Sequence, residues 1–394
     1  MSFATLDDLD CNGKRVLLRE DFNVPLKDGA VLDYTRLDAA LPTLRRLQAA
    51  GARIVVLSHL GRPKGKVDER YSLRVVAEAL ARRLGAPVAF AADCIGEPAR
   101  AAVAALKPGE ILLLENLRFH AGEEANDPTF AQALAENGDL YVNDAFGTAH
   151  RAHASTEALA HLLPCAAGPL LESEIRALSG LLGSPKRPFV CAIGGAKVRD
   201  KVALFTHLMD RVDAFCVGGG MANTFLAAKG VSVGKSLRDD DLDPAREILV
   251  RADGKNVQIH LPKDAVIAPS FDADDRSHVV TLDNVGDEMI LDIGPVTAKL
   301  YSDTLSHAKT VVFNGPMGVY EKESYRAGTR AIGDAIARAT KHGAFTVVGG
   351  GDAAAAAMLL GFANRVSHVS TGGGATLEFL EGRTLPGIAA LERS

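Results

Sequence analysis

Short apolar runs alternate with longer amphipathic stretches along the whole chain. The runs are four or five residues long and rich in branched and aromatic side chains, which is typical of strands buried in a parallel sheet. They lie at residues 15–18, 54–57, 111–114, 189–193, 214–217, 310–313 and 345–348, and helical patterns lie between them at 37–50, 73–84, 198–209 and 325–340. This alternation predicts an α/β protein with doubly wound parallel sheets.

The segment 168–188 interrupts the alternation. A helix-like stretch begins at Pro169 and ends before Gly183, and a stiff connector with two prolines follows it. The chain has 394 residues, about 2.6 times a typical domain length. We therefore expect two doubly wound, Rossmann-like domains joined by a hinge helix.

Composition and charge narrow the class of protein. A net charge of −5 argues against nucleic acid as the main partner, because binding to a phosphate backbone needs a broad positive surface. No run of 18 apolar residues occurs, and the first residues have neither the cationic start nor the apolar stretch of a signal peptide. The five cysteines are widely spaced, without a Cys-x-x-Cys pair. We expect a cytoplasmic protein without a membrane partner, a disulfide framework or a zinc knuckle.

The strand ends of the first half carry cationic side chains. In open α/β sheets ligands bind beyond the carboxyl ends of the strands. The basic residues placed there, or at the start of the first helix, are Arg19, Arg36, His59, Arg62, Arg118, His150 and Arg151. Any one of these arginines could be an ordinary surface or ion-paired residue. Together they predict a basin for a small polyanion, because guanidinium groups bind phosphate and carboxylate in a bidentate manner. Asp21 and Asn23 would bind its hydroxyls or orient the arginines.

The strand ends of the second half carry glycines instead. Glycine-rich loops follow five strands, at 194–195, 218–220, 315–318, 349–351 and 372–374. Each is expected to open a helix, whose N-terminus together with the backbone N–H groups would cradle phosphate. Two lysines, Lys197 and Lys201, are expected one helical turn apart, and the acidic Asp352 directly follows one of the loops. With these charges, the predicted ligand is a nucleoside polyphosphate with Mg²⁺. Asp352 by itself could equally be a helix N-cap.

Two segments partly match the sequence motifs of other phosphate-binding or metal-binding sites. Residues 229–236 end like a phosphate-binding Walker loop, but Lys229 occupies the first glycine position and the segment follows a helix. The aspartates at 272, 274 and 275 lack the glycine and the bidentate glutamate of a calcium loop, so a solvated acidic loop is expected. A dinucleotide fingerprint after the first strand is absent, which disfavours an oxidoreductase.

Several motifs, in order along nearly the whole chain, resemble the phosphoglycerate kinase family. They are Arg19-Glu20-Asp21-Phe22-Asn23-Val24-Pro25, Ser58-His59-Leu60-Gly61-Arg62-Pro63, the segment 141–151, Gly194-Gly195-Ala196-Lys197-Val198, Asn314-Gly315-Pro316, Gly349-Gly350-Gly351-Asp352 and Ser370-Thr371-Gly372-Gly373-Gly374. The resemblance implies a domain at 1–169 for 3-phosphoglycerate or 1,3-bisphosphoglycerate, a hinge helix at 170–183 and a domain at 184–384 for MgADP or MgATP. The tail 385–394 would return to the first domain. It further implies a glycolytic kinase that acts as a monomer.

The resemblance also implies roles for individual residues. The phosphoglycerate site would comprise Asp21, Phe22, Asn23, Arg36, His59, Leu60, Gly61, Arg62, Arg118 and Arg151. The nucleotide site would comprise Lys201, Glu321, Gly350, Gly351, Asp352 and Ala353, with Glu321 on the ribose hydroxyls and Asp352 on Mg²⁺. Charge on the transferring group would be stabilised by Arg36, Lys197, Lys201 and the amides of Gly372 and Gly373.

This chain departs from the family pattern at two positions. Ala353 stands where the family usually has Ser or Thr, so one hydroxyl contact to the nucleotide is expected to be missing. Phe313 stands where a Trp is usual. Two alternatives stay open besides the oxidoreductase, namely a kinase for another acid and a nucleotide-binding protein without catalysis. The first would need a base near Arg36, and the second would be expected to lack a charged group such as Lys201 or Asp352.

Overall fold

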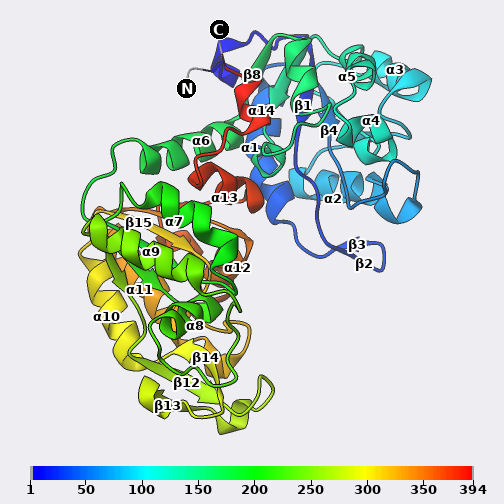
Figure 1. Cartoon of the computed structure of the whole chain (residues 1–394). Coiled ribbons are helices and arrows are strands. Elements are labelled where there is room, and N and C mark those ends of the chain that lie inside the picture. Colours follow the sequence, from blue (N-terminus) through cyan, green and yellow to red (C-terminus); the bar gives the residue numbers. More distant parts are fainter. Residues whose placement is uncertain (1–2, 393–394) are drawn as a thin grey trace. The chain divides into compact units, whose positions relative to one another are not determined.

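The computed structural model describes residues 3–392, and Figure 1 labels their helices and some of their strands. Contacts divide the chain into two compact units, one comprising residues up to Arg176 together with the segment from Thr384, the other Ala177–Arg383. A six-stranded sheet of parallel strands forms the centre of each unit, which confirms the predicted fold class. Arg393 and Ser394, the end of the predicted tail, lie outside the described residues.

The first sheet has the order β5-β6-β4-β1-β7-β8. Its strands are β1 (Arg15–Arg19), β4 (Arg53–Leu57), β5 (Val88–Ala91), β6 (Ile111–Leu114), β7 (Leu140–Asn143) and β8 (Cys165–Ala167). Val16 pairs with Ile54 on one side and with Leu140 on the other, so β1 lies at the centre. The chain first builds outward through β4 and then crosses to β7, which makes the carboxyl end of β1 the switch point where ligands bind in such sheets.

Helices cover this sheet and carry its loops. They are α1 (Thr35–Ala49), α2 (Arg74–Leu84), α3 (Gly96–Ala105), α4 (Ala121–Glu124), α5 (Pro128–Ala135) and α14 (Pro386–Ala389), and a hairpin of β2 (Leu26–Lys27) and β3 (Ala30–Val31) follows β1. One hydrophobic cluster joins Leu44 of α1 and Leu80 of α2 to Val16 in the sheet. The C-terminal segment belongs to this unit because the Gly387 N–H donates to the Ala149 carbonyl at 2.9 Å.

The second sheet has the order β11-β10-β9-β15-β16-β17. Its strands are β9 (Phe189–Ile193), β10 (Ala214–Val217), β11 (Gln258–His260), β15 (Thr310–Asn314), β16 (Phe345–Val348) and β17 (His368–Val369). Counted along the chain this is the order 3-2-1-4-5-6, in which the switch point lies between β9 and β15. The remaining helices are α6 (Pro169–Leu182), α7 (Val202–Leu208), α8 (Gly219–Ala228), α9 (Asp243–Gly254), α10 (Pro295–Ser306), α11 (Ala327–Lys341), α12 (Gly351–Leu359) and α13 (Gly374–Leu380).

The structure contains strands that the hydrophobic pattern did not predict. An antiparallel sheet in the order β13-β12-β14 interrupts the second unit, formed by β12 (Asp264–Ala268), β13 (His278–Thr281) and β14 (Met289–Ile293). The strands β5, β8 and β11 were also missed. They are edge strands with a weak local signal, since β11 is only three residues long with an exposed Gln258, and β5 and β8 consist largely of alanine, which has little strand preference.

Two expectations about the glycine loops were wrong. The loops before α8, α12 and α13 open a helix directly, but those after β9 and β15 do not, since α7 begins at Val202 and α11 at Ala327. Lys197 and Lys201 are therefore not one helical turn apart, because Lys197 lies in the loop and Lys201 ends a short 3-10 turn.

Within residues 3–392, no helix is long and apolar enough to cross a membrane.

Candidate active site

The loops after β1 and β4 meet at the switch point of the first sheet. Asp21 accepts an ion pair from Arg36 of α1, with the Oδ1 and Nη1 atoms 2.5 Å apart. The Asn23 Oδ1 atom accepts a hydrogen bond from the Gly61 N–H at 2.9 Å. His59 lies beside them, its Nδ1 atom 4.0 Å from Asp21 Oδ1. These contacts bring five of the predicted substrate residues into one group.

Arg118 is a buried cation next to this group. Its Nη1 atom donates to the Gly61 carbonyl at 2.7 Å, and its Nε atom lies 3.3 Å from Glu124 Oε1. The pKa of Arg118 is lowered to about 10, mainly by burial and also by Arg19 and Arg151, while Glu124 acts in the opposite direction. Among the described residues the buried Nη2 atom has no hydrogen-bond partner. An unsatisfied buried donor is costly, so a bound anion would relieve it.

The other predicted substrate residues differ in how they can contribute. Arg62 is exposed, and Arg151 is half-buried with its Nε atom donating to His150 Nε2 at 3.1 Å. The side chains of Phe22 and Leu60 are buried in the hydrophobic core, so these two residues can reach a ligand only through their backbone.

Arg19 does not line the basin, contrary to the sequence interpretation. Its side chain is fully buried, and its Nε atom donates to Ser155 Oγ at 2.8 Å. The strand end turns it inward because Leu18 and Arg19 alternate between the two faces of β1. Arg19 therefore lies underneath the basin, against His59.

The switch point of the second sheet is built from glycines. A Cβ atom on Gly194, after β9, would stand 1.8 Å from the Pro316 carbonyl oxygen, so only glycine fits between these loops. The Lys201 Nζ atom donates to the Gly194 carbonyl at 2.6 Å and to the Asn314 carbonyl at 2.8 Å. Burial lowers the pKa of Lys201 to about 8, while the negative charge of Asp352 acts in the opposite direction. The ammonium group of Lys201 thus contacts the backbone of both loops.

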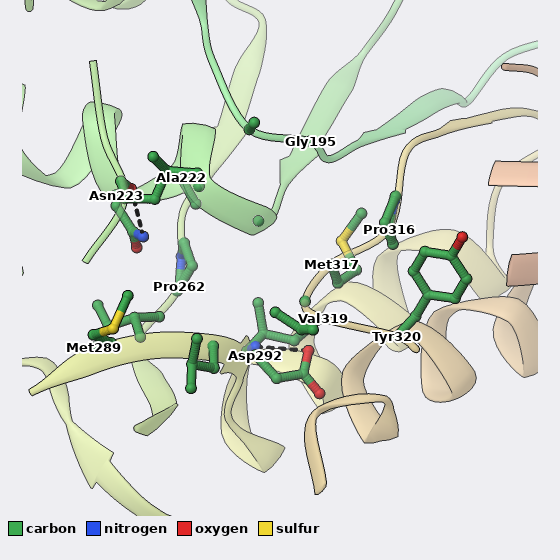
Figure 2. A pocket seen from close by; sticks show the side chains of 18 of the residues that line it. Gly195, Ala222, Asn223, Pro262, Met289, Asp292, Pro316, Met317, Val319 and Tyr320 are labelled. Atoms are coloured by element: carbon green, nitrogen blue, oxygen red, sulfur yellow. Dashed lines mark hydrogen bonds between the residues drawn. The ribbon is translucent and has the colours of Figure 1, made fainter. Parts of the chain in front are cut away.

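A cavity of about 830 Å³ opens beside these loops. Glu321 and Asp352 line it together with glycines from the loops after β9 and β10. Figure 2 shows that its other walls are largely apolar, with Met289, Met317 and Val319 among the side chains that face it. A flat aromatic base fits such walls, while the two carboxylates offer hydrogen-bond acceptors and a metal ligand.

Asp292 at the end of β14 supports the wall of this cavity. Its Oδ2 atom accepts a hydrogen bond from the Gly328 N–H at 2.7 Å, and its Oδ1 atom accepts one from the Ile293 N–H at 2.9 Å. Burial raises the pKa of Asp292 to about 7. Because Gly328 is the second residue of α11, this carboxyl ties β14 to the start of the helix that follows the loop carrying Glu321.

Sequence reasoning missed most of the cavity wall. It assigned no role to the segment from β12 to β14, which supplies Met289, Leu291 and Asp292. Two short branched runs, 264–268 and 289–293, were the available signal, but they break the β/α alternation that the interpretation relied on.

The remaining predicted nucleotide residues lie around the helix starts of α12 and α13. Gly350 has a φ of +100°, which glycine adopts without strain, and Gly351 begins α12. Ala353 is 1% exposed and belongs to the hydrophobic core, so its methyl group does not face the cavity. The Gly372 N–H donates to Ser370 Oγ at 3.3 Å, whereas Gly373, with a φ of +53°, is partly exposed.

Two Rossmann-like units, one with a basin of arginines and the other with a glycine-lined cavity, define a kinase that acts on a small anion. The chain matches the family model described as phosphoglycerate kinase over residues 6–383. It is 54% identical to the phosphoglycerate kinase of Moorella thermoacetica over 99% of both chains. The solved phosphoglycerate kinase of Coxiella burnetii superposes with a TM-score of 0.90 at 43% identity, covering 99% of both chains. That of Pyrococcus horikoshii superposes with a TM-score of 0.87 at 35% identity, covering 98% of both.

The chain belongs to the phosphoglycerate kinase family, as the motifs predicted. It is an enzyme of the kinase class, and the oxidoreductase and non-catalytic alternatives are set aside.

Proposed function

We propose that the protein transfers a phosphoryl group reversibly between 1,3-bisphosphoglycerate and MgADP, giving 3-phosphoglycerate and MgATP. An oxygen of the ADP β-phosphate attacks the acyl phosphate, and the bond between phosphorus and the acyl oxygen breaks with its electron pair leaving on the carboxylate. The observation that carries the substrate assignment is the Arg118 guanidinium, buried in the basin with an unsatisfied Nη2 atom. This oxygen is ionised at neutral pH, and so is the 3-phosphoglycerate carboxylate that attacks in the reverse direction. No general base is therefore required.

The protein's contribution is then positioning and charge. Asp21, Asn23, His59 and Gly61 would orient phosphoglycerate, and Arg62, Arg118 and Arg151 would hold its phosphate. Arg36 would stabilise the transferring group from the first unit, with Lys197, Lys201 and the amides of Gly372 and Gly373 from the second. The Gly373 N–H is the better placed of the two amides, because that of Gly372 already donates to Ser370.

The nucleotide would occupy the cavity of the second unit. Its base would lie between the apolar walls, and Glu321 would accept hydrogen bonds from the ribose hydroxyls. Gly350, Gly351 and the backbone of Ala353, at the N-terminus of α12, would face the phosphates.

Asp352 fits the requirements of a magnesium ligand. It is an exposed carboxylate on the cavity wall, and its charge acts on Lys201. Mg²⁺ prefers oxygen ligands and commonly takes one or two carboxylates together with substrate phosphates. When bound with the nucleotide it neutralises charge on the phosphate oxygens.

The two sets of residues belong to different units, so transfer requires the units to close on each other. The boundary between the units falls inside α6, between Arg176 and Ala177, which supports this helix as the hinge. We further propose a monomer that acts in the cytoplasm.

A coupled assay with 3-phosphoglycerate and MgATP tests the assignment. Lys201→Ala should remove turnover, and Lys229→Ala, which alters an exposed lysine in the same unit, should leave it unchanged. Arg36→Ala should lower kcat far more than it raises KM, because its contact is made mainly in the transition state. Binding of MgATP without any turnover of 3-phosphoglycerate would instead point to another acid as substrate.

A further inference from the structure

A chain of buried polar groups runs beneath the arginine basin. The Glu123 carboxylate, which is fully buried, accepts hydrogen bonds from the Ser155 N–H at 3.0 Å and from Ser155 Oγ at 2.6 Å. Ser155 Oγ in turn lies 2.8 Å from Arg19 Nε. The Arg19 Nη2 atom lies 3.2 Å from His59 Nδ1, and its Nη1 atom donates to the Glu20 carbonyl.

The chemistry of these groups fixes the direction of every hydrogen bond. A serine hydroxyl has one proton, and here it goes to Glu123, so the lone pair of Ser155 Oγ accepts from Arg19. A guanidinium group has only donors, so His59 Nδ1 must accept the hydrogen bond from Arg19 Nη2. The proton of a neutral imidazole then resides on Nε2. Among the described residues, His59 Nε2 makes no hydrogen bond.

We infer that Arg19 is a positioning residue that locks His59 in the neutral Nε2–H tautomer, so that this ring presents one fixed donor to the anionic substrate. This inference rests on the proposed function, because it concerns the same phosphoglycerate site. Arg19 acts through His59 and need not touch the substrate.

The charges around His59 keep the ring neutral. Burial lowers the pKa of His59 well below its usual value, and the cations lower it further. These cations are Arg19, Arg118, Arg36 and, when protonated, His153. Asp21 is the opposing charge, but it lies 4.0 Å from Nδ1 and is already paired with Arg36. A neutral donor neither gains nor loses a proton across the physiological range, so its contribution to binding is independent of pH.

The first test reads the tautomer directly in the full chain. Long-range ¹H–¹⁵N NMR on protein with ¹⁵N-labelled histidines distinguishes a protonated from an unprotonated ring nitrogen, and His59→Gln assigns the signal. We expect a protonated Nε2 and a bare Nδ1 from about pH 6 to pH 9. An Nδ1–H tautomer, or an imidazolium at pH 7, would overturn the inference. The measurement needs no substrate, so it fails or succeeds independently of the proposed function.

The second test removes the hydrogen bond from Arg19 to His59 Nδ1. Arg19→Met should release the tautomer and raise the KM for 3-phosphoglycerate about tenfold at pH 8, as expected for losing one hydrogen bond to a charged group. The KM should recover as the pH falls and the ring becomes cationic, whereas kcat should change little. Arg15→Met is the matched control, since Arg15 begins the same strand and pairs with Asp139 away from His59. A KM that rises equally at every pH, with the tautomer unchanged, would show a merely structural role. If Arg19→Met fails to fold, the NMR result on the unaltered chain decides.

Discussion

Nucleotide binding should weaken as the pH rises through about 8, because Lys201 loses its charge there. Burial lowers the pKa of this ammonium group, which donates to the Gly194 and Asn314 carbonyls, from 10.5 to about 8. In the free enzyme, half of the Lys201 side chains are then neutral at pH 8 and about nine in ten at pH 9. If the neutral amine contributes nothing to phosphate binding, the dissociation constant of MgADP should rise roughly twofold at pH 8 and roughly tenfold at pH 9.

Isothermal titration of MgADP between pH 6.5 and 9.5 measures this directly. Lys201→Arg is the matched variant, because a guanidinium group stays charged throughout this range. Its affinity for MgADP, whatever its absolute value, should stay constant with pH. By contrast, the kcat of the unaltered enzyme should change less than its kcat/KM for nucleotide, because bound phosphate favours the charged amine.

Two results would refute this reasoning. A constant MgADP affinity up to pH 9.5 in the unaltered chain would mean that the buried lysine keeps an ordinary pKa. A tenfold loss that persists in Lys201→Arg would assign the titration to another group.

Three further predictions concern stability and packing. Burial raises the pKa of the folded Asp292 carboxyl to about 7, so the unaltered chain should lose up to about 4 kcal/mol of unfolding free energy between pH 4 and pH 7. Asp292→Asn should remove this pH dependence, which urea titrations at several pH values measure. The same dependence of unfolding free energy on pH in both proteins would contradict the prediction. Gly315→Ala should lower the unfolding free energy by about 2 kcal/mol or more, since its Cβ would stand 2.3 Å from the Gly194 carbonyl oxygen. Gly230→Ala, also at positive φ but with open space, is the control, and an equal loss there would rule out the clash. Ala353→Thr should cost about 1–3 kcal/mol by overpacking the core without tightening MgADP binding; calorimetry of unfolding and binding checks both, and tighter binding would show that the hydroxyl reaches the nucleotide.

The strand ends could be located from the sequence because they depend on local pattern. Continuous apolar runs such as Ile111–Leu114 mark central strands, and the polar residues that follow each run must lie at the carboxyl edge of the sheet. This simple geometry was enough to place the arginines and the glycine loops at the strand ends. Edge strands were missed because their local signal is weaker, since half of β5 is alanine and β11 has only three residues, two of them polar.

The wall of the base cavity could not be predicted in this way. It is formed by an antiparallel sheet inserted in an α/β pattern, and Met289 and Leu291 reach the cavity only because β14 pairs with β12. Ala353 illustrates the same limit. Its position suggested a missing phosphate contact, but as the third residue of α12 it packs its methyl group into the core.

By itself, the sequence determined the α/β class, the family and the residue types offered at the strand ends, because these follow from periodicity and from motifs that are local in the chain. Only the tertiary structure decided what each side chain does there. It turned Arg19 under the basin against His59, and it set Lys201 between two loop carbonyls that are 120 residues apart in the chain. Burial and hydrogen-bond direction depend on neighbours brought together by packing. Burial sets the charge of Lys201, and hydrogen-bond direction sets the tautomer that we infer for His59.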